Sequence, residues 1–485
     1  MSSDNGGIIG VVNDPTDTVA SGVWQQEEQY EAKVNGTWPQ RPLLMTKSLR
    51  FNNDSSDYLN FTPLSTTNRR TFTISFWFKT TTVAGGSNYI FSTGNYAGGD
   101  GFLQIFLSSS GRLTVEDYDQ SGDSYNLRWG TPSTYLLRDP GAWYHFVLAI
   151  DSTQGTQSNR AKIYINGVNV SSLFTQTTSP AQNDDFHINT SGQIQQFGRS
   201  QNNNNYYDGY LTECIVVDGQ QLAPTSFGVS NSDGVWTPII YEGTFGTNGF
   251  NLQFENAAAL GEDSSTNGNN FTVNNLTSID QSTDYPVVNY ATLNSLYPVT
   301  TFSYSEGNLK GSSSGSAKGT ARGTIGIQDS GKWFFEVKIT TNDGSGVGIS
   351  AEDMDANTWE PSSGTFVIYT SDGNKVVNGT GSSYGASFGD GDIIGVAYNS
   401  DNAEITFYKN GASQGTITGV TTGKFMFPSI SDTSTSGDAI FECNFGSPPY
   451  SISSGNADGN GYGNFEYAVP SGYYALNTKN LAEFG

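Results

Sequence analysis

The chain has 485 residues, more than one hydrophobic core accommodates, and its formal net charge of −24 comes from 46 acidic against 22 basic residues. This charge argues against a nucleic-acid-binding protein, which needs a basic surface to neutralise phosphates, and it disfavours docking on an anionic membrane. An aromatic content of 13% together with 58 glycines is typical of short strands joined by tight turns, not of a disordered chain.

Residues 1–44 form a first segment that is too short to fold around a core of its own. We interpret this segment as an arm that attaches the protein to another subunit of a larger particle. The candidate anchoring residues are its apolar and aromatic side chains Ile8, Ile9, Val23, Trp24, Tyr30 and Trp38.

Residues 45–228 are predicted to form a first β-sandwich. Apolar and polar side chains alternate over residues 71–79 and again over residues 143–150, which is typical of strands that pack on a core by one face. The dipeptide Asn166-Gly167 lies between two alternating runs and predicts a tight hairpin, because both turn residues need a positive φ.

Residues 229–290 are predicted to be a connecting segment, part of which is a candidate to complete the first sandwich. Residues 291–485 again contain only strand-like runs, with alternation over residues 333–339 and 439–445 and a second hairpin signal at Asn410-Gly411. Strands at this spacing predict an all-β protein made of two antiparallel β-sandwiches.

Two families resemble these blocks. Residues 45–228 resemble a laminin-G-like, concanavalin-type jelly roll, and the stretches that carry the likeness are KSLRF at 47–51, the strand at 72–79, WYH at 143–145, the hairpin at 163–168 and YDGYL at 207–211. Residues 291–485 are similar to a SPRY-type sandwich through SGKWFFEV at 330–337, GDIIGVA at 391–397, ITFYKNG at 405–411 and the strand at 441–445.

The first module resembles the version of the laminin-G-like jelly roll that occurs in marine and cyanobacterial bacteriophage proteins. The stretches concerned are residues 218–228, GTFGTNGF at 243–250 and NGNNFTV at 267–273, and the arm at 22–39 is similar to the leading segments of phage fibre proteins. The resemblance implies a virion component: a tail fibre, a receptor-binding protein or a head-attached appendage. It would bind other virion proteins, itself as a homo-oligomer (a trimer is expected) and a glycan or protein of the host surface.

Three alternatives stay open at this point: a capsid decoration or cement protein, a secreted bacterial lectin or adhesin, and an enzyme. Residues 1–10 lack the basic start and apolar core of a secretory signal, and no run approaches the roughly 20 apolar residues of a membrane span. We therefore expect a virion protein made in the host cytoplasm, without membrane insertion.

The densest acidic cluster lies at residues 116–119. Hydrolysis of a glycoside needs two carboxylates that converge on one sugar, and alternation in a strand would place Glu116 on the opposite face from Asp117 and Asp119. We therefore expect no enzyme. Asp117, Asp119 and Asp123 are oxygen donors of the kind that calcium uses, so this cluster is either a solvated loop or part of a calcium site. No other cofactor is expected.

Aromatic residues that we expect in polar loops are the better functional candidates. Aromatic faces next to amides suit both sugar rings and protein partners, although rings in loops also commonly cover the edge of a core. The candidate binding residues are Tyr118, Tyr125, Trp129, Tyr206 and Tyr207 in the first sandwich and Trp359 in the second.

The two cysteines, Cys214 and Cys443, lie far apart in strand-like runs, and we expect buried free thiols rather than a disulfide. The two histidines, His145 and His187, are too few for a metal site or a catalytic triad. We expect His145 to be an ordinary residue of a strand.

Overall fold

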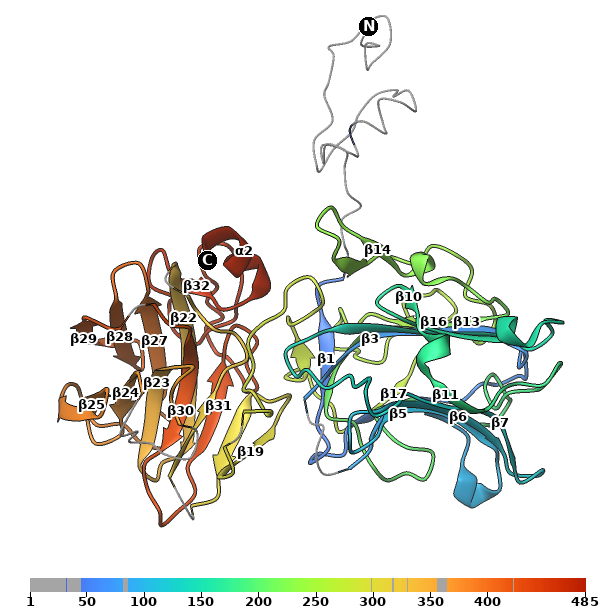
Figure 1. The fold of residues 1–485 in the computed structure, drawn as a ribbon, viewed down its shortest axis with the longest axis horizontal. Coiled ribbons are helices and arrows are strands. Elements are labelled where there is room, and N and C mark those ends of the chain that lie inside the picture. The colour runs from blue at the N-terminus through green and yellow to red at the C-terminus, as the bar shows by residue number, and fades with distance from the viewer. Residues whose placement is uncertain are drawn as a thin grey trace, which may run out of the picture.

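The structure is a computed structural model that describes residue 32 and residues 45–81, 86–297, 299–315, 318–328, 330–355, 364–421 and 423–485. The predicted anchoring residues (Ile8, Ile9, Val23, Trp24, Tyr30 and Trp38) and the predicted binding residue Trp359 lie outside these ranges. The described chain forms two β-sandwiches that stand side by side (Figure 1), which confirms the predicted fold class.

The first sandwich packs two eight-stranded antiparallel sheets face to face. The β3 sheet has the order β10 (Val168–Asn169), β9 (Ala161–Ile165), β8 (Tyr144–Asp151), β3 (Thr71–Thr80), β13 (Gly209–Asp218), β1 (Ser48–Phe51) and β18 (Gln281–Ser282), and β16 (Phe250–Leu252) also pairs with β13. The β5 sheet has the order β11 (Thr175–Thr178), β7 (Ser124–Gly130), β6 (Leu113–Asp119), β5 (Phe102–Leu107), β4 (Asn88–Thr93), β12 (Gln195–Phe197), β2 (Tyr58–Phe61) and β17 (Thr272–Asn274).

The core of the first sandwich follows the predicted alternation. Phe72, Ile74, Phe76 and Phe78 of β3 are fully buried between the two sheets. The hairpin prediction is also confirmed, because Asn166 and Gly167 join β9 to β10 with φ angles of 47° and 79°. The opposite face of β3 carries Thr73, Ser75, Trp77 and Lys79, and these side chains are buried as well.

A short hairpin covers part of that outer face of the β3 sheet. It consists of β14 (Gly228–Ser230) and β15 (Trp236–Pro238), and its Trp236 indole donates a hydrogen bond from Nε1 to Nδ1 of His145 at 3.0 Å. Because Nδ1 accepts, the neutral imidazole carries its proton on Nε2 and donates to Ser75 Oγ at 2.9 Å. The His145 ring also stacks on Trp77 with 4.7 Å between centroids, and its burial lowers the pKa of His145 to about 3.

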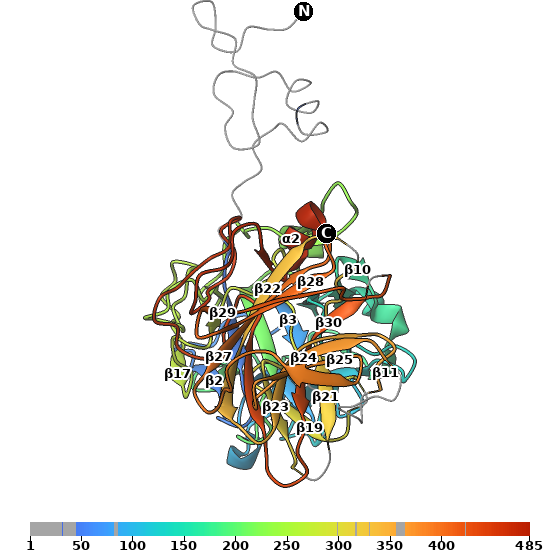
Figure 2. The same cartoon turned by 90° about the vertical axis from the view of Figure 1, so that its left-hand side faces the viewer.

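The second sandwich, which faces the viewer in Figure 2, again has two sheets. The β22 sheet has the order β19 (Phe302–Ser305), β20 (Lys310–Ser313), β31 (Ile440–Asn444), β22 (Lys332–Thr341), β27 (Ile393–Asn399), β28 (Glu404–Lys409) and β29 (Ala412–Thr418), with β32 (Tyr474–Ala475) parallel to β22. The β23 sheet has the order β21 (Gly319–Arg322), β30 (Met426–Asp432), β23 (Ser345–Ala351), β24 (Phe366–Thr370), β25 (Asn374–Val377) and β26 (Thr380–Ser383).

The inward faces of the second sandwich are also as predicted. Trp333, Phe335, Val337 and Ile339 of β22 lie on the same inward face of the sheet as Ala439, Phe441, Cys443 and Phe445 of the neighbouring β31 region, and all are buried in one core. Asn410 and Gly411 turn β28 into β29 with φ angles of 48° and 78°, which confirms the second hairpin prediction. The chain ends on helix α2 (Thr478–Phe484), and none of the helices in the described ranges is long and apolar enough to cross a membrane.

A buried ion pair lies where the two sandwiches meet. The ammonium of Lys79, on the outer face of β3, donates to Asp284 Oδ2 and to Asn289 Oδ1, each at 2.8 Å. The indole of Trp143 donates to the other oxygen of Asp284 at 2.9 Å. Burial raises the pKa of the Asp284 carboxyl, and the neighbouring ammonium opposes that shift.

The turn between β19 and β20 packs directly on the first sandwich. The Tyr210 hydroxyl donates to the carbonyl of Gly307 at 3.0 Å, and the Asn308 amide donates to the carbonyl of Thr81 at 2.8 Å. The fully buried Arg50 pairs with Glu306 at 3.4 Å. The junction is therefore an extensive polar contact, not a loose linker.

Candidate functional site

The β5 sheet lies opposite the β3 sheet in the first sandwich (Figure 1). A row of polar side chains crosses its outer face, the face that does not pack in the core. The neighbours of these polar residues along each strand point inward: Leu103 and Ile105 of β5 and Val115 of β6 lie in the core. The ladder pairs Gln104 of β5 with Glu116 of β6, and Glu116 with Arg128 of β7. We call Gln104, Glu116 and Arg128 the polar row.

Hydrogen bonds fix the side chains of the polar row. Gln104 Nε2 donates to Glu116 Oε2 at 2.9 Å, and Arg128 Nε donates to Glu116 Oε1 at 3.1 Å. The guanidinium of Arg128 also lies over the ring of Tyr125, 4.6 Å from its centroid. The row therefore holds one carboxylate, one amide and one cation in a fixed arrangement, in which Gln104 and Glu116 are buried and Arg128 is exposed.

Aromatic rings border the polar row on both sides along the strands. On one side Tyr89 stacks on Phe106 with 4.7 Å between centroids. On the other side Phe102 stacks on Tyr118 at 5.4 Å, and Tyr118 meets Tyr125 edge to face at 5.0 Å. These two aromatic groups lie on opposite sides of Gln104, because Phe102 and Phe106 are its neighbours two positions away on the same face of β5.

Of the predicted binding residues, Tyr118 and Tyr125 therefore belong to this face. Their rings are half-buried, and the Tyr118 hydroxyl donates to Asp123, a contact that raises the pKa of Tyr118 to about 12. Tyr206 lies elsewhere, next to the half-exposed Tyr58, with 6.3 Å between centroids. The structure does not bring Tyr206 into contact with the polar row.

Two placements predicted from sequence are wrong. Trp129 was expected in a polar loop, but it belongs to strand β7, is 4% exposed and packs in the core, where its Nε1 donates to Ser179. Tyr207 is fully buried, and its hydroxyl donates to the carbonyl of Lys79 at 3.1 Å. The outward residues of β7 and the asparagines before Tyr207 are polar, which made both rings resemble loop residues.

The structure does not bring the acidic side chains Asp117, Asp119 and Asp123 together in one cluster. Asp117 points inward, where its carboxylate accepts from the backbone N–H and ring of His187 and from Asn126. Asp119 instead accepts from the backbone and hydroxyl of Ser121, and these hydrogen bonds lower the pKa of Asp119. Their oxygens are thus engaged separately. Nowhere in the described ranges do three or more His, Cys, Asp or Glu side chains converge to hold a metal ion.

Gln104, Arg128 and the stacked pair of Tyr89 and Phe106 were not among the residues predicted from the sequence. A signal for the row exists: Gln104, Glu116 and Arg128 are each separated by twelve residues. This is the spacing of consecutive strands in a meander, so equivalent positions become cross-strand neighbours. The hydropathy pattern does not reveal the row, because each of its residues looks like an ordinary solvent-facing position of an alternating strand.

Both cysteines are buried and free, as predicted. Burial raises the pKa of the Cys214 and Cys443 thiols well above the usual range, so neither is an activated nucleophile. His145 is a strand residue of β8, also as predicted.

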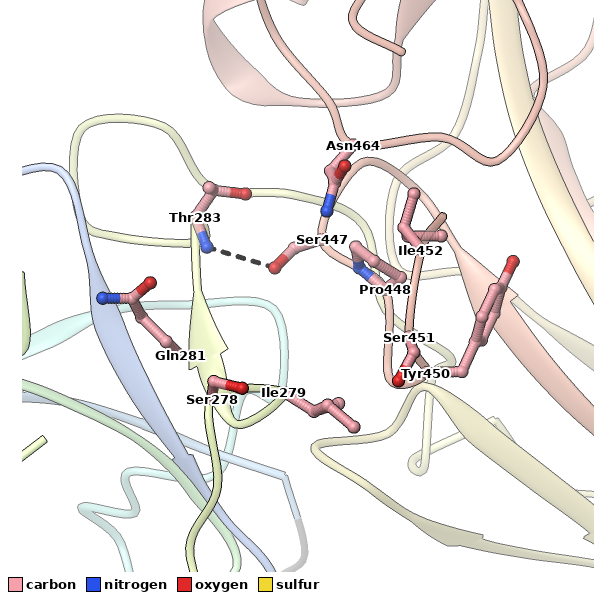
Figure 3. Close-up of a pocket in the computed structure, with 10 residues that line it drawn as sticks. All are labelled: Ser278, Ile279, Gln281, Thr283, Ser447, Pro448, Tyr450, Ser451, Ile452 and Asn464. Carbon is pink, nitrogen blue, oxygen red and sulfur yellow. Dashed lines mark hydrogen bonds between the residues drawn. The ribbon is translucent and has the colours of Figure 1, made fainter. Parts of the chain in front are cut away.

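Two hollows lie away from the polar row. One of about 290 Å³ opens at the junction between the sandwiches (Figure 3), where Ile279 and Gln281 lie opposite Pro448 and Ile452, and Thr283 N donates to Ser447 Oγ at 3.2 Å. The other, of about 360 Å³, is lined by residues of the β24–β26 end of the second sandwich, among them Thr370 and Asp372. Neither combines stacked rings with a row of charged and amide groups.

Comparison with known proteins agrees with this architecture. Residues 53–223 match the family model described as the concanavalin A-like lectin/glucanases superfamily (Laminin_G_3), and residues 332–447 match the SPRY domain.

Similar solved structures include the SPRY domain of human HERC1, at 22% identity and a TM-score of 0.26 over 28% of this chain and 87% of that one. They also include a native heptameric SAP-like pentraxin from Limulus polyphemus, at 18% identity and a TM-score of 0.26 over 37% of this chain and 78% of that one. The matched domain models identify a concanavalin-like domain followed by a SPRY domain, a pairing that suggests a carbohydrate- or protein-binding, adhesin-like module.

Proposed function

We propose that this chain is an adhesion protein of a bacteriophage virion that binds a host-surface glycan through the polar row and its flanking rings. The observation that carries the proposal is the arrangement of Gln104, Glu116 and Arg128 between two stacked aromatic groups. A sugar ring has apolar C–H faces, which pack on aromatic rings, and hydroxyls at its edge, which bond to amides and carboxylates.

The virion part of the proposal is supported by sequence resemblance. Residues 218–228, 243–250 and 267–273 resemble marine and cyanobacterial bacteriophage proteins, and residues 22–39 are similar to the leading segments of phage fibre proteins. In this proposal the arm binds other virion proteins, and the sandwiches face the host as a homo-oligomer, with three copies as the expected number. Cryo-electron microscopy of the particle would distinguish a tail or appendage position from a capsid-decorating one.

We propose binding without catalysis. Hydrolysis of a glycosidic bond uses two carboxyl groups that flank the bond. Glu116 is the one acidic member of the polar row, and its two oxygens are already engaged by Gln104 and Arg128. The proposed function requires no cofactor.

The test is binding to an array of bacterial surface polysaccharides. Replacing Tyr89 or Tyr118 by Ala removes one stacked ring from either side of the polar row, and each change should weaken binding roughly tenfold. Phe425→Ala is the matched control, because this ring is 44% exposed on the second sandwich. Unchanged binding by both tyrosine variants, or an equal loss in the control, would contradict the proposal.

A further inference from the structure

Arg128 is the member of the polar row that a ligand can reach. Its side chain is 48% exposed, whereas Glu116 and Gln104 are buried. The guanidinium donates to Glu116 through Nε, and within the described part of the chain neither of its Nη groups has a hydrogen-bond partner. Because a guanidinium presents its donors as a planar fork, these free groups suit a carboxylate or a sulfate, which accepts two parallel hydrogen bonds.

The buried members of the row hold Arg128 in position. Glu116 accepts from the Arg128 Nε at 3.1 Å and is itself held by Gln104 at 2.9 Å. The ring of Tyr125 supports the guanidinium, with 4.6 Å between Cζ and the ring centroid. A side chain that is fixed before a ligand arrives loses less rotamer freedom on binding. Gln104 and Glu116 are therefore positioning residues, and Arg128 is the group that contacts the ligand.

A second guanidinium lies beside Arg128 on the same face of the sheet. Arg112 directly precedes β6, and its Nε donates to the carbonyl of Thr131. Its Nη2 lies next to Gly130 of β7, 3.6 Å from the point where a Cβ would stand, and Thr114 Oγ1 lies at the same distance from that point. Gly130 follows Arg128 by two positions, roughly 7 Å along the strand, on the same face. The two guanidiniums therefore border a place where β7 has no side chain.

We propose that the glycan bound by this face is acidic, with carboxylate or sulfate groups that accept hydrogen bonds from Arg128 and Arg112, an inference that rests on the proposed glycan binding. The charge of Glu116 is balanced by Arg128 in their ion pair, so Arg112 gives this part of the face a positive charge. The net charge of −24 repels an anion at long range. At physiological salt, however, the Debye length is about 8 Å, so the contacts with the two guanidiniums decide the affinity.

The experiment is a calorimetric titration of the full chain with two matched pairs of oligosaccharides. One pair is an oligogalacturonate and its methyl ester, and the other is a sulfated galactan and the same galactan without sulfate. The members of each pair differ only in their anionic groups. In at least one pair the acidic member should bind roughly tenfold more tightly than its neutral form at about 150 mM salt, because only the acidic member accepts charged hydrogen bonds from the guanidiniums.

Arginine variants identify the groups responsible. Arg128→Gln should weaken binding of the acidic member about tenfold and leave the neutral member unchanged, and its amide can still donate to Glu116. Arg128→Lys keeps the charge but not the fork, so it should restore only part of the loss. Arg112→Gln should weaken acidic binding about threefold. The matched control is Arg70→Gln, which removes an arginine that is 47% exposed and paired with Asp185. Circular dichroism checks that each variant is folded.

The outcomes separate this inference from the proposed function. Neutral forms that bind as tightly as acidic forms, with the same dependence on Tyr118, would overturn the inference and leave glycan binding intact. An acidic preference that survives in both Arg128→Gln and Arg112→Gln, or that falls equally in Arg70→Gln, would also overturn it. If none of the four ligands bound, the polysaccharide array would decide. Binding there that depends on Tyr118 but not on Arg128 would overturn the inference alone, and an array without Tyr118-dependent binding would overturn both.

Discussion

At the scale of single residues, His145 shows how burial fixes a protonation state. Both ring nitrogens are used, Nδ1 by the Trp236 indole and Nε2 by the Ser75 hydroxyl, and Trp77 covers one ring face. A proton on Nδ1 would break the hydrogen bond that Trp236 of the β14–β15 hairpin donates to this nitrogen. The neutral imidazole is therefore part of the fold.

This arrangement predicts a loss of stability in mild acid. The pKa of His145 is about 3 in the folded protein and about 6.5 in the unfolded chain. Between these two values the imidazole is protonated in the unfolded chain only, so lowering the pH stabilises the unfolded state. Urea unfolding of wild type and His145→Phe should show the wild type losing about 2 kcal/mol relative to the variant between pH 7 and pH 4.5. A pH-independent difference between the two proteins would refute this assignment.

At the scale of secondary structure, three short strands from the predicted connecting segment join the first sandwich. β16 pairs with β13, β17 with β2 and β18 with β1. The same segment contributes Phe250, Leu252 and Phe271 to the first core. Without it, strands β1 and β2 would become open edges and the core would lose apolar side chains.

The strand pairing predicts where the first sandwich can be cut. A fragment of residues 45–284 should unfold in one cooperative transition, whereas residues 45–228 should aggregate or unfold without cooperativity because of the exposed edges and the incomplete core. Circular dichroism during thermal unfolding and limited proteolysis are the measurements. Equal stability of the two fragments would show that the added strands do not contribute.

The sequence was sufficient to predict which side chains of a strand point inward, but not which strands become neighbours. Phe72 to Phe78 were placed correctly because alternation is a local property. Gln104, Glu116 and Arg128 meet only through the order β5–β6–β7, and the stacking of Tyr89 on Phe106 depends on the pairing of β4 with β5. Trp129 and Tyr207 were misplaced because their polar neighbours along the chain point outward while they point inward.

At the scale of the whole molecule, the junction joins the two sandwiches through buried polar contacts. Lys79 and Asp284 have side-chain exposures of 0% and 2%, and Trp143, Asn289 and Tyr290 supply the remaining hydrogen bonds. A buried ion pair contributes little compared with apolar residues, but loss of one partner leaves an isolated charge in the interior.

Asp284→Asn should therefore destabilise the protein by about 3 to 5 kcal/mol. Calorimetry should show a lower melting temperature and two separated transitions in place of one, because the contact that couples the sandwiches is weakened. The double variant Lys79→Met/Asp284→Leu should recover most of the loss, since no charge then remains uncompensated. An unchanged single transition in Asp284→Asn would mean that the pair does not hold the junction.

The same junction fixes the separation between the proposed binding face of the first sandwich and the described strands of the second. A ligand that contacts both sandwiches binds more tightly than one that contacts a single sandwich only if the distance between its two contact points equals the distance between the two sites. No flexible linker between the sandwiches can adapt to another spacing. The molecule would then distinguish host surfaces by how far apart their repeating groups stand, as well as by their chemistry.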